Sequence, residues 1–80
     1  MRRSFAERLR AARITGGYAK QKDFAAAIGI ESERYRMWER GDREPDITHL
    51  VKIAAKLEVS LDFLLRGGPD QPPLRRVISA

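Results

Sequence analysis

The sequence predicts an all-α domain, a compact bundle of five short helices. Apolar residues recur at helical spacing, as at Leu50, Ala54 and Leu57. Glycines and prolines interrupt the chain at intervals typical of short helices. No alternation of apolar and polar residues is long enough to build a sheet. With 80 residues, the chain has the length of one domain.

Three helices are expected in the first half. Ser4 and Glu7 have the spacing of a capping box, which predicts that the first helix begins at Ser4. Its inner face would carry Phe5, Leu9 and Ala12, and Thr15-Gly16-Gly17 would end it. The second helix is expected at 21–28, with Phe24, Ala25 and Ile28 inward and a stop at Gly29. The third is expected at 32–39, with Tyr35 and Trp38 three residues apart and a stop at Gly41.

Two more helices are expected in the second half. Pro45-Asp46 opens the fourth, with Asp46 as its N-cap. Its apolar stripe would be Ile47, Leu50, Val51, Ala54 and Leu57. Ser60 would cap a fifth helix that carries Leu61, Leu64 and Leu65 and ends at Gly67-Gly68. We therefore expect one helical domain at 1–68, and a proline-containing linker with a basic, apolar tail at 69–80.

Composition narrows the functional classes. The chain is 42% hydrophobic and 34% charged, as expected of a globular domain. It lacks cysteine, which fits a reducing compartment, and it has no apolar run near the roughly 18 residues that span a bilayer. A cytoplasmic protein with no membrane partner is expected. The sequence contains one histidine, His49, which is expected on the outer face of the fourth helix, and it contains no glycine-rich phosphate loop. Both observations argue against an enzyme, a metal site or a cofactor.

The balance of charge favours a polyanionic partner. Sixteen Lys and Arg residues against 11 Asp and Glu residues give a net charge of +5. The arginines occur mainly in two groups. One group lies within the first 13 residues, and the second consists of Arg34, Arg36, Arg40 and Arg43. Nucleic acid is the first partner to consider.

Residues 21–40 have the pattern of two helices that cross steeply. Ala25 is small enough for close packing, Gly29 can adopt the positive φ that the turn needs, and Tyr35 and Trp38 anchor the second helix. The outer face of that helix would be polar and arginine-rich, and its width suits a DNA major groove. This face consists of Ser32, Glu33, Arg34, Arg36, Met37 and Arg40.

From Phe5 to Leu65 the chain resembles the lambda-repressor-like (Cro/CI-type, XRE-type) helix-turn-helix DNA-binding family. The resemblance rests on a leading Gln21, on Phe24-Ala25, on the turn at Gly29, and on the motifs WERG…P and L..IA..L.VS.D.LL. The chain departs from the family at Lys20, where Thr or Ser is usual, and at Glu58, which replaces a frequent Gly.

The resemblance implies roles for individual residues. Gln21 would touch a phosphate or brace a side chain of the recognition helix. Ser32, Glu33, Arg34 and either Arg36 or Met37 would face base edges. Arg40 and Arg43 would contact the DNA backbone or minor groove. Arg13 and Glu39 would form a structural ion pair between the first and third helices.

Alternatives stand beside these roles. Glu33 can accept a hydrogen bond from cytosine N4, or it can serve only as a helix-start carboxylate. Arg34 and Arg36 can pair with Glu31 and Glu33 instead of DNA, and Asp42 and Glu44 can neutralise the two arginines that follow.

The predicted function is a sequence-specific transcriptional regulator, a repressor that binds a palindromic operator as a homodimer on the nucleoid. The alternative is an antitoxin or other protein-binding module on the same fold, with a toxin or phage factor as partner. The expected dimer surfaces are Val59, Phe63 and Leu65, or Leu74, Val77 and Ile78 in the tail.

Overall fold

The computed structural model describes residues 2–67, and the predicted linker and tail at 69–80 lie outside this range. Five helices make up the fold, and residues 2–67 contain no strand, so the all-α prediction is confirmed. The helices are α1 (Arg2–Thr15), α2 (Gln21–Ala27), α3 (Ser32–Arg40), α4 (Ile47–Leu57) and α5 (Leu61–Arg66). Helices α2 and α3 differ from their predicted ends by one residue, which is the usual uncertainty of a helix boundary.

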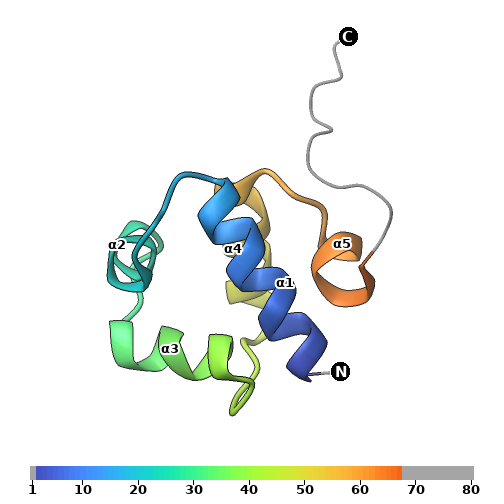
Figure 1. Ribbon diagram of the computed structural model, residues 1–80, viewed down its shortest axis with the longest axis horizontal. Helices are drawn as coiled ribbons and strands as arrows, with labels where there is room; N and C mark the ends of the chain where they lie inside the picture. The colour runs from blue at the N-terminus through green and yellow to red at the C-terminus, as the bar shows by residue number, and fades with distance from the viewer. Residues whose placement is uncertain (1, 68–80) are drawn as a thin grey trace, which may run out of the picture.

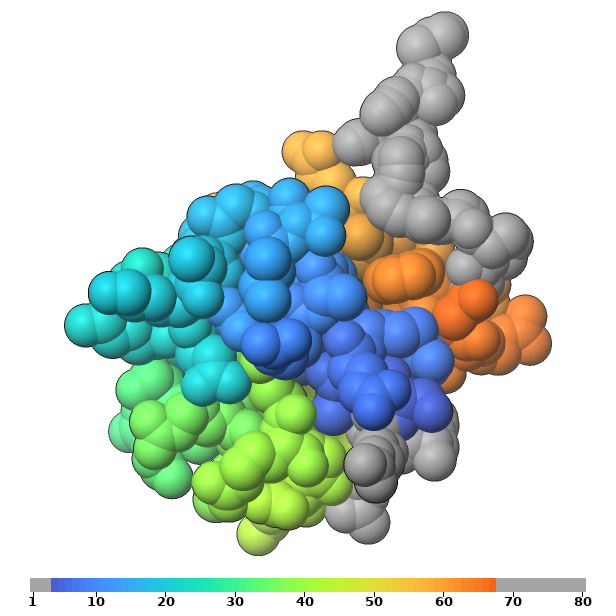
Figure 2. All heavy atoms as spheres, viewed as in Figure 1, coloured from blue at the N-terminus to red at the C-terminus, as the bar shows by residue number. Residues whose placement is uncertain are grey.

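Helix α1 crosses in front of α4 at the centre of the molecule (Figure 1). Helices α2 and α3 lie to one side of this crossing, and α5 lies to the other. Helix α3 contacts both α1 and α2, and α5 contacts both α1 and α4. The face of α3 that turns away from these contacts is therefore an outer edge of the molecule, as its position at the bottom of Figure 2 also shows.

The core takes one fully buried large side chain from every helix. These side chains are Leu9, Phe24, Tyr35, Ile53 and Leu64. The aromatic rings meet edge to face, with 5.4 Å between the centroids of Phe24 and Tyr35 and 5.9 Å between those of Tyr35 and Trp38. Trp38 is 3% exposed, so the inward placement predicted for these aromatic residues is confirmed.

Most predicted helix ends are present. Gly29 and Gly41 have φ values of +74° and +82°, which only glycine adopts without strain. Asp46 accepts a hydrogen bond from the His49 backbone N–H at the start of α4, and Ser60 does the same for Phe63 at the start of α5.

Both departures from the family at helix ends have a structural counterpart. Lys20 makes no side-chain capping bond at the start of α2. Glu58 ends α4 with a φ of +60°, a conformation strained for a side-chain-bearing residue.

The predicted capping box at Ser4 is wrong. Helix α1 begins at Arg2, so Ser4 lies within its first turn and cannot be the N-cap. Arginine has a high helix propensity, and nothing in the sequence before Ser4 stops the helix from extending by two residues.

The apolar stripe predicted for α4 is partly wrong. Ile47 and Val51 are 64% and 51% exposed. The buried residues are Leu50, Ile53, Ala54 and Leu57, which repeat the same helical spacing but start one turn later. His49 was expected on the outer face, but its ring centroid lies 5.5 Å from that of Trp38 and its side chain is 18% exposed.

Candidate nucleic-acid interface

Helices α2 and α3 form the predicted helix-turn-helix. Ala25 is 1% exposed at their junction, and its carbonyl accepts a hydrogen bond of 2.9 Å from the backbone N–H of Ile30 in the turn. The small side chain of Ala25 allows the turn to fold back closely, and Gly29 supplies the left-handed conformation there. The pair of helices is thus held together by local backbone geometry as well as by the core.

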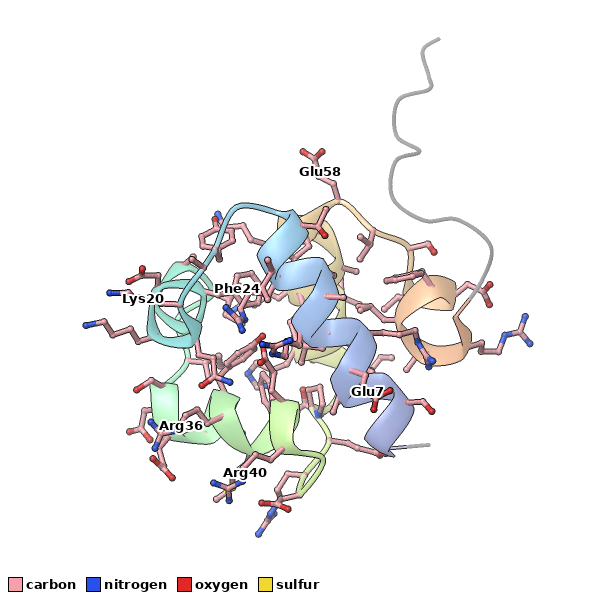
Figure 3. The ribbon with its side chains drawn as sticks, in the orientation of Figure 1. Glu7, Lys20, Phe24, Arg36, Arg40 and Glu58 are labelled. Carbon is pink, nitrogen blue, oxygen red and sulfur yellow. The ribbon has the colours of Figure 1, made fainter. Side chains whose placement is uncertain are left out.

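The buried side of α3 determines which residues face outward. With Tyr35 and Trp38 in the core, a rotation of about 100° per residue places Glu33, Met37 and Arg40 in the row farthest from it. Glu33 and Arg40 are exposed and Met37 is half-buried. Arg36 and Arg40 lie on the side of α3 away from the other helices (Figure 3). The polar outer face predicted from sequence is therefore present.

Two of its arginines have acidic partners. Arg36 Nη2 lies 2.6 Å from Glu33 Oε1, and Arg40 donates from Nε and Nη2 to Asp42 Oδ2 at 2.9 and 2.6 Å. The hydrogen bond to Asp42 raises the pKa of Arg40. Both pairs are solvent-exposed, with 48% of the Arg36 side chain and 59% of the Arg40 side chain accessible. A neighbouring carboxylate therefore offsets part of the positive charge of each arginine.

Arg34 and Arg43 meet at a shallow hollow of about 220 Å³ beside the C-terminal part of α3. The hollow lies on the flank of α3 that faces the start of α4, and Asp46 also lines it. The pKa of Asp46 is lowered, mainly by the hydrogen bond from the His49 backbone N–H and to a smaller extent by the charge of Arg34. Neither arginine forms an ion pair with another residue in the range 2–67.

A buried carboxylate anchors the inner side of α3 to the rest of the domain. Glu39 accepts hydrogen bonds from Arg13 Nε at 2.7 Å, from Gln21 Nε2 at 2.9 Å and from the Tyr35 hydroxyl. The Arg13 and Glu39 side chains are only 4% and 2% exposed. Arg13 also donates from Nη1 to the carbonyls of Tyr18 and Ala19, both at 2.8 Å. One cluster thus links α1, the turn before α2, α2 and α3.

Within this cluster Arg13 and Glu39 are the ionised groups. Burial alone would raise the pKa of Glu39, but the hydrogen bonds from Arg13, Tyr35 and Gln21 outweigh burial, and the pKa is lowered. The hydrogen bond to Glu39 raises the pKa of Arg13 despite its burial. Burial raises the pKa of Tyr35, and the hydrogen bond to Glu39 raises it further, so the hydroxyl stays protonated and donates.

Sequence reasoning placed Gln21 either on a phosphate or against the recognition helix, and in the structure its amide nitrogen lies on Glu39. The sequence predicts Tyr35 only as an apolar anchor of α3, so the hydrogen bond of its hydroxyl to Glu39 was missed. The signal that could have revealed it is the four-residue spacing of Tyr35 and Glu39, which puts a hydroxyl and a carboxylate on one helix face.

The range 2–67 contains neither a candidate metal site nor a membrane-spanning helix. No group of three or more His, Cys, Asp or Glu side chains within it is arranged to hold a metal ion. None of the helices described is both long enough and apolar enough to cross a bilayer.

Two crossed helices with an aromatic inner face and an arginine-rich outer face define the helix-turn-helix class of DNA-binding folds. The family model described as "Helix-turn-helix" matches residues 9–64. The chain therefore belongs to the helix-turn-helix family, in its Cro/CI-like (XRE) type, a family of DNA-binding regulators rather than enzymes.

Curated relatives come from Bacillus subtilis (strain 168). The chain is 39% identical over 75 residues to the SPbeta prophage-derived uncharacterized HTH-type transcriptional regulator YonR. The aligned region covers 94% of this chain and 68% of YonR. It is 45% identical over 47 residues to the uncharacterized HTH-type transcriptional regulator YqaE, covering 59% and 40% of the two chains. It is 37% identical over 62 residues to the HTH-type transcriptional regulator ImmR, covering 78% and 48%.

This chain thus spans about two thirds of the first of these relatives and less than half of each of the other two. No solved structure matches it closely enough to count as a relative.

Proposed function

We propose that the protein is a sequence-specific transcriptional regulator that represses its target by occupying an operator on the nucleoid. The observation that supports this most directly is the division of α3 into two faces. Tyr35 and Trp38 are buried, and the opposite face presents arginine, glutamate and serine side chains on a helix at the edge of the molecule. All three relatives quoted above are described as HTH-type transcriptional regulators.

In the proposed complex α3 lies in the major groove. Its outer face reads base edges, and the residues assigned to this task are Ser32, Glu33, Arg34, Arg36 and Met37. Arg40 and Arg43 contact phosphates, which fixes the register of the helix on the duplex. Gln21 acts mainly as a brace, because its amide nitrogen already donates to Glu39, and its second amide N–H is left to approach a phosphate.

We propose that the regulator binds a palindrome as a homodimer. One such unit reads only a few base pairs, too few for a unique site in a genome, and two units with half-sites about one helical turn apart solve this problem. The side chains expected at the dimer surface, Val59 just before α5 and Phe63 and Leu65 within it, are partly buried against the core. Ile47 and Val51, one turn apart on α4 and largely exposed, are better candidates for the contact with a second copy.

Selection of bound duplexes from a random DNA pool tests this function. The expected result is a palindromic consensus, and the substitutions Arg34→Ala and Arg36→Ala are expected to weaken binding to it without loss of helical content. Lys52→Ala is a matched control, because it removes an exposed positive charge from α4, away from the recognition helix. Transcription from a promoter that carries the recovered site should fall when the protein is added.

Recovery of no consensus, or equal effects of Lys52→Ala and the two arginine substitutions, would contradict the proposal. In that case a protein-binding role on the same fold would be favoured.

A further inference from the structure

Glu33 and Arg36 are in direct contact on the outer face of α3. Arg36 Nη2 lies 2.6 Å from Glu33 Oε1, with 48% of the Arg36 side chain and 63% of the Glu33 side chain exposed. Arg36 is thus one half of a donor–acceptor pair rather than a lone cation. We propose that this pair reads one G·C base pair as a unit, and that Glu33 keeps Arg36 from binding the phosphates of unrelated DNA. The inference rests on the proposed function of α3 as the recognition helix.

The order of hydrogen-bonding groups supports G·C. The Arg36 guanidinium presents two parallel N–H donors, and the Glu33 carboxylate places an acceptor directly beside them. Along the major-groove edge, a G·C pair presents two acceptors, guanine N7 and O6, and then a donor, cytosine N4. The pair of side chains has the complementary order, so Arg36 can bind guanine while Glu33 accepts from the cytosine paired with it.

The same order disfavours A·T. An A·T pair presents an acceptor, adenine N7, then a donor, adenine N6, and then an acceptor, thymine O4. With Arg36 over the purine, its second N–H would face the N6 amino group, and the Glu33 carboxylate would face the lone pairs of thymine O4. Two like groups would then oppose each other, whereas an isolated arginine would suffer only the first of these conflicts.

The contact also limits binding to unrelated DNA. A phosphate that approaches Arg36 meets the negative charge of Glu33 at hydrogen-bond distance from the guanidinium. Without that charge, Arg36 is free to neutralise one phosphate, which releases counterions and makes the salt dependence of binding steeper by about 0.9 per phosphate. Glu33 therefore favours the operator over other DNA by weakening the alternatives as well as by reading a base.

The test compares Glu33→Gln with Glu31→Gln in the full chain. Glu31 is an exposed glutamate directly before α3 that makes no side-chain capping bond, so its substitution removes the same charge from the same region. The base pair in question is first located as the operator position at which Arg36→Ala abolishes base preference. Affinity is then measured for the operator, for an operator with A·T at that position and for an unrelated duplex, each at several salt concentrations.

Glu33→Gln is expected to reduce the preference for G·C at that position by about 5- to 150-fold, the range for one good base contact. It should also strengthen binding to the unrelated duplex, with a salt slope steeper by about 0.9. Glu31→Gln should retain the G·C preference and leave the salt slope on unrelated DNA close to that of wild type. In the double variant Glu33→Gln, Arg36→Ala, the loss of preference should equal that of Arg36→Ala alone.

The inference is overturned if Glu33→Gln keeps the G·C preference, relaxes a different position or behaves as Glu31→Gln does. Failure of the proposed function looks different, because the wild-type chain would then select no sequence at all.

Discussion

Arg13 and Glu39 meet at 2.7 Å between helices α1 and α3, with less than 5% of either side chain exposed. A buried ion pair of this kind adds little stability compared with apolar residues, but removal of one partner leaves an uncompensated charge in the interior. The position of α3 therefore depends on a contact on its inner side, away from the exposed face that is proposed to bind DNA.

Glu39→Gln should lower the free energy of unfolding by about 3–5 kcal/mol, because Arg13 stays charged and buried without its counter-ion. Urea titration followed by circular dichroism measures this change. Glu33→Gln, on the exposed face of the same helix, is the control and should change stability by less than about 0.5 kcal/mol. Equal stability of the two variants would contradict a structural role for the Arg13–Glu39 pair.

The same carboxylate predicts a dependence of stability on pH. The pKa of Glu39 is lowered from its ordinary value of 4.5, so the folded state binds its proton less readily than the unfolded state does. The stabilisation is fully present above pH 4.5 and is lost as the pH falls through the lowered pKa. The difference in unfolding free energy between wild type and Glu39→Gln should therefore shrink as the pH is lowered from 7 to 3. A difference that stays constant over this range would show that Glu39 does not titrate as proposed.

Trp38 is 3% exposed and packs against Tyr35 and His49. Trp38→Ala should cost about 3–5 kcal/mol, a large part of the stability of a domain this size. Trp38→Phe keeps an aromatic ring in the core and should cost less. The two variants are compared by thermal melts, and a cooperative wild-type melt for Trp38→Ala would contradict the core position.

Arg40 and Asp42 form a pair whose two members should have opposite effects on DNA binding. Arg40→Ala should weaken binding to all duplexes alike and reduce the salt slope by about 0.9, since one phosphate contact is lost. Asp42→Asn should strengthen binding to all duplexes, because it frees Arg40 from its acidic partner. Binding isotherms at four or more salt concentrations check both. An unchanged slope for Arg40→Ala would remove it from the set of phosphate contacts.

Ile47 and Val51 offer a test of the dimer surface. The double substitution Ile47→Lys, Val51→Lys should shift the protein from dimer to monomer in sedimentation equilibrium, because four buried charges would then face one another across a twofold interface. Ile14→Lys, at the other exposed large apolar residue of the range 2–67, is the control and should leave the mass unchanged. If Ile14→Lys has the same effect, or the double variant stays dimeric, the contact lies elsewhere.

The sequence predicted helix ends correctly where only one or a few residue types suit the local backbone geometry. Gly29 and Gly41 end helices because φ values near +74° and +82° suit glycine alone, and Asp46 and Ser60 cap helices because their side-chain oxygens reach the free N–H groups. The prediction of a capping box at Ser4 failed because such a box requires a non-helical residue at its start. The sequence did not prevent α1 from beginning at Arg2, which places Ser4 within the helix.

The register of α4 was harder to predict for a similar reason. Its apolar residues outnumber the positions that face the core, so stripes that begin at Ile47 and at Leu50 fit the helical period equally well. Only the neighbouring helices decide between them, and these also bring His49 against Trp38. The hydrogen bonds of Gln21 and Tyr35 to Glu39 depend likewise on the angle at which three helices meet.

Glu39 draws together α1, α2 and α3 on one side of the recognition helix, while every residue proposed to read bases lies on its opposite or lateral surfaces. On the proposed function, substitutions at Glu33, Arg34 or Arg36 would therefore alter which DNA is preferred without loosening the scaffold that holds these residues. A regulator that works as proposed here would acquire a new operator in single mutational steps, each of which leaves a folded protein for selection to act upon.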